Sequence, residues 1–176
     1  MLVSCFVIFF VLGIVNFFYL ESYKKNVGNK INFRNYFFES EISSFDSNVG
    51  DEFLLKLIIP SIDFEMGIYD IESEYNEVNL NVELLASSQL DNNVFFFAGH
   101  SGRGENCYFN RVNELILGDI IFVKSKDKNL VYEVVKIYNI VKNGYMEVDK
   151  YLEDVLFLIT CSDYNRQLVV KGVLIN

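Results

Sequence analysis

From residue 53 onward the chain alternates between short apolar runs and clusters of turn-forming residues. The runs are rich in Ile, Val, Phe and Tyr, and the clusters contain Gly, Asn, Asp and Ser. β-Branched and aromatic residues favour extended backbone, and the turn residues end each run. This pattern predicts an all-β domain with strands over residues 53–59, 66–71, 93–98, 119–124, 130–137, 155–160 and 167–175.

Helices are expected to be few and short. Helical turns suit residues 80–87 and residues 108–115, because apolar residues recur at helical spacing around Phe109 and Val112. Many short strands with few helices favour a closed or nearly closed barrel. With 176 residues, the chain fits one domain of ordinary size over residues 53–176.

The N-terminal segment is apolar enough to cross a membrane as a helix. Residues 2–20 contain no charged side chain and would span about 28 Å as a helix, which just crosses a bilayer. A cleaved signal peptide is the alternative, but no basic stretch precedes the apolar one and Phe17, Phe18 and Tyr19 are too bulky for a cleavage site. We therefore predict a transmembrane anchor over residues 1–20, followed by a stalk or N-terminal appendage over residues 21–52.

The charges of the chain restrict its partners. Its net charge of −9 argues against nucleic acid, which requires a basic face. The basic cluster Lys24, Lys25, Lys30 and Arg34 follows the predicted anchor. By the positive-inside rule this cluster would keep the following domain in the cytoplasm, so the residues alone leave the orientation open.

Three side chains with useful chemistry stand at the ends of predicted strands. His100, the single histidine, follows the apolar run 94–98, and Cys161 follows the run 155–160. Arg166 comes just beyond the polar turn 162–165. If the last two strands form a hairpin around that turn, Cys161 and Arg166 face each other across it. Bringing His100 beside them requires the tertiary fold.

Structural roles are the alternative for each residue taken alone. A lone histidine is more often structural than catalytic, and a cysteine at a strand end is often a packed thiol. A thiol near cations is instead the pattern of an activated nucleophile, so the combination favours catalysis. Cys107 is expected to be a packed or surface thiol, with a disulfide to Cys161 under oxidation as a further hypothesis.

No cofactor or metal is predicted. The acidic residues could bind calcium, but their spacing matches no loop motif and a solvated surface is favoured; they are Asp63, Glu65, Asp70, Glu72, Glu74 and Glu77. One histidine and scattered cysteines cannot supply a zinc site. The glycines of the loop 99–104 do not match a nucleotide-binding fingerprint.

Six short strings stand out along the chain. They are Leu-Ile-Ile-Pro-Ser-Ile at 57–62, Ala-Gly-His at 98–100, Tyr-Phe-Asn at 108–110, Leu-Ile-Leu-Gly-Asp-Ile-Ile at 115–121, Leu-Ile-Thr-Cys at 158–161 and Arg-Gln-Leu-Val-Val at 166–170. In this order they resemble the sortases, cysteine transpeptidases of Gram-positive cell surfaces, and the first string resembles the first barrel strand of that family. The resemblance covers about residues 53–175 and implies an eight-stranded β-barrel behind an N-terminal membrane anchor, on the extracellular face of the cell membrane.

The resemblance also implies a reaction. Cys161 would attack the carbonyl between Thr and Gly of an LPxTG-like sorting motif and form a thioester. His100 would act as general acid and then as general base, while Arg166 would position the substrate and stabilise the oxyanion. The acyl group would pass to an amine of a cell wall precursor or of a pilin.

Two other functions are left open by the sequence. The barrel could be catalytically silent and bind a surface peptide, or it could be a cysteine protease with water as acceptor. The choice of sorting motif is expected to depend on the loop over residues 138–151.

Overall fold

The computed structural model describes residues 52–148 and 152–175. The predicted anchor, and the predicted stalk apart from Glu52, lie outside these residues. Within the described ranges, no helix is both long and apolar enough to cross a membrane.

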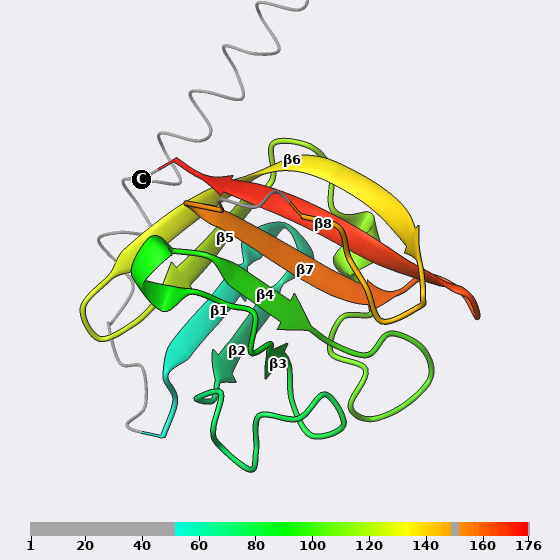
Figure 1. Cartoon of the computed structure of the whole chain (residues 1–176), viewed down its shortest axis with the longest axis horizontal. Helices are drawn as coiled ribbons and strands as arrows, with labels where there is room; N and C mark the ends of the chain where they lie inside the picture. The colour runs from blue at the N-terminus through cyan, green and yellow to red at the C-terminus, as the bar shows by residue number, and fades with distance from the viewer. Residues whose placement is uncertain (1–51, 149–151, 176) are drawn as a thin grey trace, which may run out of the picture. The chain divides into compact units, whose positions relative to one another are not determined.

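Eight strands and three short 3-10 helices make up the described part of the chain (Figure 1). The strands are β1 Leu55–Ile59, β2 Phe64–Ile68, β3 Glu83–Leu84, β4 Phe95–Ala98, β5 Ile120–Lys124, β6 Asn129–Val141, β7 Val155–Cys161 and β8 Arg166–Leu174. The 3-10 helices are η1 Pro60–Ile62, η2 Leu90–Asn92 and η3 Val112–Glu114.

The strands form one sheet in the order β2-β1-β5-β6-β8-β7-β4-β3. Among the described strands, every pairing is antiparallel except that of β4 with β7, which is parallel. The sheet curls so that its two edges approach each other, and the Asn81 side chain just before β3 donates a hydrogen bond to the Gly67 carbonyl in β2. The result is a nearly closed barrel, as the strand pattern predicts. It has eight strands within the described residues, as the family resemblance implies, and β3 is the one that the pattern does not include.

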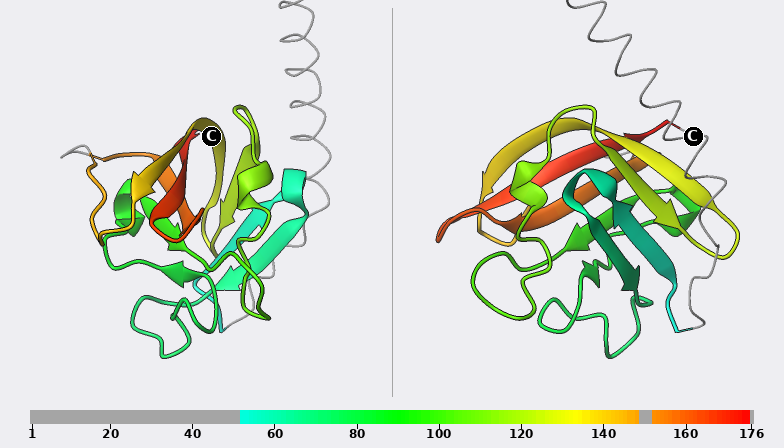
Figure 2. Two further views of the ribbon diagram at one scale, coloured as in Figure 1. Left: turned by 90° about the vertical axis from the view of Figure 1, so that its right-hand side faces the viewer. Right: turned by 180° about the vertical axis from the view of Figure 1, so that it is seen from behind.

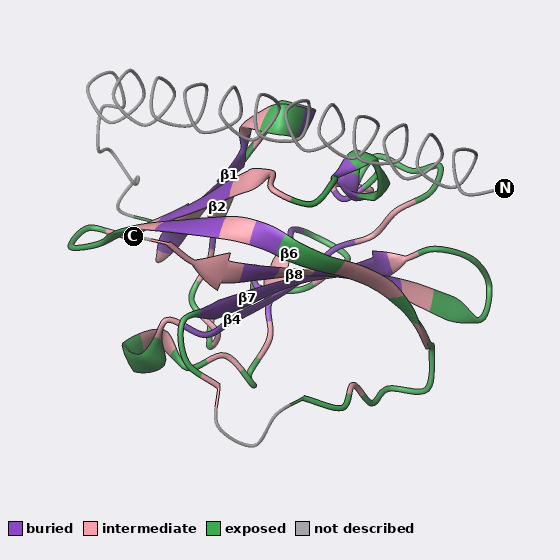
Figure 3. Ribbon diagram, turned by 90° about the horizontal axis from the view of Figure 1, so that it is seen from above, coloured by how far each residue is buried: buried purple, intermediate pink, exposed green. Residues whose placement is uncertain are grey.

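Strand alternation divides the apolar side chains between two faces. Leu156 and Leu158 of β7 pack into the main core inside the barrel, whereas Val155 and Phe157 pack into a smaller cluster on the outer face of the sheet. Figure 3 shows this burial along β4, β7 and β8. Met146 and Leu152, from the segment between β6 and β7, pack against the outer cluster. The outer face of β4, β7 and β8 is therefore apolar and lies beneath this segment.

The predicted strands are found with shifted ends, and one predicted helical turn is wrong. Residues 80–87 contain β3, not a helix, because Asn76 holds the segment extended. Its side chain accepts from the Leu84 backbone N–H at 2.8 Å and donates to the Leu84 carbonyl at 3.0 Å. The second predicted turn contains η3, a single 3-10 turn.

The longest departure in a strand is at the end of β6. This strand continues to Val141, beyond the predicted end at Ile137, because Tyr138 and Ile140 still pack on the outer cluster and pair with β8. The ends of β4, β6 and β7 and the start of β8 lie on the right-hand side of Figure 1. Figure 2 shows the same loops from two other directions.

Candidate active site

The parallel pairing of β4 with β7 brings His100 and Cys161 to the same edge of the sheet. Ala98 is paired with Ile159, and His100 and Cys161 each stand two residues further along these strands. Beyond the last pair, the Gly99 N–H donates to the Ile159 carbonyl at 3.1 Å and the Thr160 hydroxyl donates to the Gly99 carbonyl at 2.8 Å. The spacing of His100 and Cys161 in the sequence does not predict that they lie at the same edge; the parallel pairing of β4 with β7 brings them there.

The loop after β4 is tied to the end of β7 and to itself. The Ser101 hydroxyl donates to the backbone carbonyl of Cys161. The Phe109 N–H returns to the His100 carbonyl at 2.9 Å, which closes the loop. Gly99 must be small here, since a Cβ on it would lie 2.7 Å from the Phe109 ring. The backbone of His100 is thus held by the contacts of Gly99 before it and of Ser101 and Phe109 after it.

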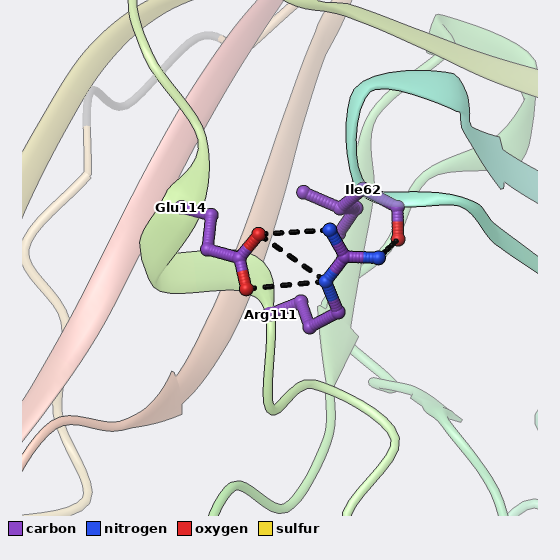
Figure 4. Close-up of polar contacts among 3 residues, drawn as sticks. All are labelled: Ile62, Arg111 and Glu114. Carbon is purple, nitrogen blue, oxygen red and sulfur yellow. Dashed lines mark hydrogen bonds and ion pairs between the residues drawn. The ribbon is translucent and has the colours of Figure 1, made fainter.

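A charged fork holds the next part of this loop against the barrel. Arg111 donates to the Ile62 carbonyl in η1 at 2.7 Å and to the carboxylate of Glu114 at 2.9 to 3.2 Å (Figure 4). The hydrogen bond from Arg111 lowers the pKa of Glu114, so this pair is ionised at neutral pH. The loop that carries His100 is therefore anchored to the turn between β1 and β2.

The imidazole of His100 has a side-chain partner. Its Nε2 lies 3.0 Å from Oδ1 of Asn79, a residue of the segment between β2 and β3. Asn79 is itself held, because its backbone carbonyl accepts from the Asn106 side chain at 2.7 Å. An amide oxygen at Nε2 favours the tautomer with its proton there and leaves Nδ1 as the basic nitrogen. A base oriented by a third group is the usual arrangement for activating a nucleophile.

Cys161 is a free, half-buried thiol at the end of β7. Its sulfur lies 3.5 Å from Nζ of Lys142, the residue just after β6. Reactive cysteines are found in partly exposed, electropositive surroundings of this kind. Cys107, the other cysteine among the described residues, is also a free thiol and lies in the loop after β4.

The predicted register of the last hairpin is wrong. Cys161 is paired with Gln167, and Arg166 is paired with Val141 of β6. The difference is one residue, because the Ser162 N–H donates to the Arg166 carbonyl at 3.0 Å and so extends the ladder past Cys161. A shift of one residue moves a side chain to the other face of a sheet.

Gln167 therefore takes the place predicted for Arg166. It shares the outer face of the sheet with Cys161, whereas alternation groups Arg166 with the inward-facing Leu168. The guanidinium of Arg166 is turned to Asp163 in the turn, with Nε 2.7 Å from Oδ2. This hydrogen bond lowers the pKa of Asp163. The side chain of Arg166 remains 61% exposed.

A cleft of about 520 Å³ opens beside Cys161 at this end of the barrel. It is lined by polar groups of the loop after β4 and of the β7–β8 turn, including Ser101, Asn110, Asn113 and Asp163. A second hollow of about 530 Å³ is lined by residues of β1, β5 and η2 and contains none of the predicted site residues. Of these two hollows, the first adjoins the thiol and is placed to receive a group that reacts with it.

Within the described residues, no three His, Cys, Asp or Glu side chains are grouped closely enough to hold a metal ion. Part of the acidic run is engaged locally, since Glu65 forms an ion pair with Lys56 and Asp70 accepts from the Glu72 N–H at 3.0 Å.

Comparison with known proteins identifies the family. The model of the sortase domain matches residues 57–175. This chain belongs to the sortase family.

Solved sortases share its fold. Sortase C-1 from Actinomyces oris is 26% identical with a TM-score of 0.61, and the match covers 72% of this chain and 76% of that one. Sortase C from Streptococcus pneumoniae is 25% identical with a TM-score of 0.61, over 72% of this chain and 68% of that one. Sortase A from Listeria monocytogenes, at 21% identity, has a TM-score of 0.60 over 72% and 89% of the two chains. No curated protein matches the sequence.

Three polar neighbours of this sortase's site were missed by sequence reasoning: Asn79, Lys142 and Gln167. Gln167 could have been found by considering a hairpin register shifted by one residue. Lys142 follows a strand that extends beyond its predicted end. Asn79 lies in a polar segment without periodicity, where the sequence carries no signal for its contact with His100.

Proposed function

We propose that this sortase is a membrane-anchored cysteine transpeptidase with its catalytic domain on the extracellular face of the cell. It cleaves an LPxTG-like sorting motif between Thr and Gly and transfers the new acyl group to an amine. The observation that carries the proposal is the parallel β4–β7 pairing, which sets His100 and the Cys161 thiol at one edge of the sheet. The membership of the chain in the sortase family supports the same chemistry.

In the first half of the proposed reaction, Sγ of Cys161 attacks the Thr carbonyl carbon. The S–C bond forms, the C–N bond to Gly breaks, and protonated His100 gives its proton to the departing amine. In the second half, the incoming amine forms a new C–N bond and passes its proton to His100, while the C–S bond breaks and the thiolate is restored. Atoms and charges balance over the cycle without a cofactor.

A donor is needed for the oxyanion that develops on the Thr carbonyl. We assign this role to Arg166, whose guanidinium is exposed and adjoins the site but must first leave Asp163. Gln167 is the competing donor, because its amide shares the face of Cys161. Substitution of each residue separates the two assignments.

The apolar residues of the motif have a matching surface. Ala98 and Ile159 are partly exposed on the outer face, two residues before His100 and Cys161 respectively. Ile140 of β6 packs against the same outer cluster. A peptide that lies along this face would place its Thr carbonyl beside the thiol. The segment between β6 and β7, which packs over the same face, would then select the motif.

The acceptor is an amine of a cell wall precursor or of a pilin. The structure of sortase C from Streptococcus pneumoniae gives insight into the pilin substrate specificity of that enzyme, which favours a pilin lysine as the first acceptor to test here. The test uses the full-length chain in detergent, fluorogenic sorting-motif peptides, and either a pilin-derived lysine peptide or a glycine peptide as amine.

We expect an amide product with at least one amine and loss of all cleavage in Cys161→Ala. Cleavage that yields only the hydrolysed peptide would make the protein a protease. Peptide binding without cleavage would make it a silent binding barrel. Full activity in Cys161→Ala would overturn the assignment.

A further inference from the structure

We propose that Lys142 is a catalytic residue of this sortase and that its ammonium group stabilises the Cys161 thiolate. The proposal deepens the function proposed above and rests on it for the identity of the nucleophile. The contact that carries it is the 3.5 Å approach of Lys142 Nζ to Cys161 Sγ.

The backbone fixes Lys142 at this position. β6 is paired with β8 as far as Val141, which lies opposite Arg166. The Lys142 N–H then donates to the Asn165 carbonyl at 2.8 Å, so the residue is attached to the β7–β8 turn that follows Cys161. Alternation along β6 places Lys142 on the same face as Tyr138 and Ile140, which is the face that carries Cys161. The approach is therefore a consequence of the sheet register.

Other charged groups near the thiol have partners of their own. Arg166 and Asp163 are paired with each other in the turn. The His100 ring is bonded to Asn79. Arg103 also lines the cleft. Among the described residues, Lys142 is the one cation within hydrogen-bond distance of Sγ, and no described carboxylate forms an ion pair with it.

An ammonium group in this position would act in both halves of the reaction. Before acylation it favours the thiolate, whose proton has passed to His100 or to water, and so raises the fraction of reactive enzyme. In the thioester the sulfur carries no charge, and Lys142 has no anion to stabilise. When the incoming amine expels the sulfur, Lys142 again stabilises the departing thiolate, and a more stable thiolate leaves faster.

The test measures alkylation of the thiol itself, without a peptide substrate. Full-length protein is treated with iodoacetamide over a series of pH values, and modification of each cysteine is followed by peptide mass spectrometry. The reagent is neutral, so the charge of Lys142 does not attract it. Cys107 in the same molecule provides the internal reference.

Neutral and charged replacements at one position separate charge from shape. At pH 7 we expect Lys142→Met to slow alkylation of Cys161 about fivefold to tenfold, which is the range a unit charge near 4 Å produces at a partly exposed site. The pH midpoint of alkylation should move upward in the same variant. Lys142→Arg should retain most of the rate because it keeps the positive charge.

Lys136→Met is the matched control. Lys136 is in β6, the strand that Lys142 follows, and its replacement by Met removes the same charge. Its ammonium lies over the Tyr138 ring, 4.8 Å from the centroid. We expect this variant to alkylate like the wild type. If Lys142→Met slows both Cys161 and Cys107, then Lys142→Gln replaces it as the neutral variant.

Unchanged rates and midpoints at Cys161 in the neutral variants would overturn the role of Lys142. Peptide cleavage in the same samples keeps this result apart from the proposed function. A thiol that depends on Lys142 in a protein that cleaves no peptide would uphold the inference and reject the transpeptidase. Normal peptide cleavage, together with an alkylation rate that does not change when Lys142 is replaced, would uphold the transpeptidase and reject the role of Lys142.

Discussion

Asp163 accepts a hydrogen bond of 2.7 Å from Nε of Arg166, three residues further along the β7–β8 turn. The same carboxylate accepts from the Asn165 N–H at 3.0 Å, so it closes the turn while it holds the guanidinium. The arginine closest in sequence to the nucleophile is thus occupied when no substrate is bound.

The Asp163 carboxyl should titrate at lower pH than an ordinary aspartate. Its hydrogen bond with Arg166 lowers its pKa, so the stabilisation of the turn is present above the ordinary aspartate pKa and is lost as pH falls through the lowered value. NMR titration of the carboxyl carbon measures this midpoint. The midpoint should move back toward the ordinary value in Arg166→Gln, and an identical midpoint in both proteins would contradict the pairing.

Arg166→Ala should lower kcat/KM about 10²-fold, the usual effect of removing one oxyanion donor. Gln167→Ala should have a smaller effect if Arg166 leaves Asp163 to reach the substrate. Asp163→Asn serves as the control, since it frees the guanidinium and should keep or raise activity. The opposite ranking of the Arg166 and Gln167 variants would transfer the oxyanion role to Gln167.

Asn79→Ala should reduce kcat about tenfold and shift the pH profile of the reaction, since general acid–base catalysis needs an oriented imidazole. Asn79 contacts the ring at Nε2, 3.0 Å from its Oδ1, and so positions it. Asn79→Asp should recover part of the rate, because it keeps an acceptor oxygen at the same distance. An unaltered pH profile in Asn79→Ala would show that the contact with His100 has no part in the reaction.

Gly99→Ala should destabilise the domain by about 1–3 kcal/mol, the usual effect of adding a methyl group to a packed site. The new Cβ would lie 2.7 Å from the buried Phe109 ring, and relief of this contact would displace the neighbouring His100. Chemical denaturation measures the loss. Gly104→Ala is the control, because its Cβ would meet only the Cys107 sulfur, at 3.3 Å, in an exposed loop. An equal loss of stability in the two variants would refute the steric explanation.

Much of the barrel could be predicted because local patterns determine it. Runs such as Phe95–Ala98 and Val155–Cys161 have the composition of buried strands, and the turn residues between runs mark their ends. Residues 80–87 depart from the predicted helical turn because β3 is only two residues long and is held by Asn76, a contact that no periodicity records.

The candidate site was predictable only in part. His100 and Cys161 stand out as reactive residues after apolar runs, but their proximity depends on a parallel pairing between strands some sixty residues apart. A four-residue turn would set Arg166 opposite Cys161, and one additional hydrogen bond at Ser162 is enough to exchange it for Gln167. Contacts that depend on a single register step cannot be read from spacing alone.

The parallel β4–β7 pair places the reacting residues at the ends of strands, whereas the residues that surround them lie in loops. His100 and Cys161 lie at the ends of adjacent strands that begin at Phe95 and Val155, and the paired residues Phe95 and Leu156 are buried in the core. The pairing of these two buried strands therefore sets the separation of the two residues. The groups around them come from the irregular segments that carry Asn79, Lys142 and Asp163. Substitutions in these segments could therefore change the sorting motif, the acceptor or the rate without moving His100 and Cys161.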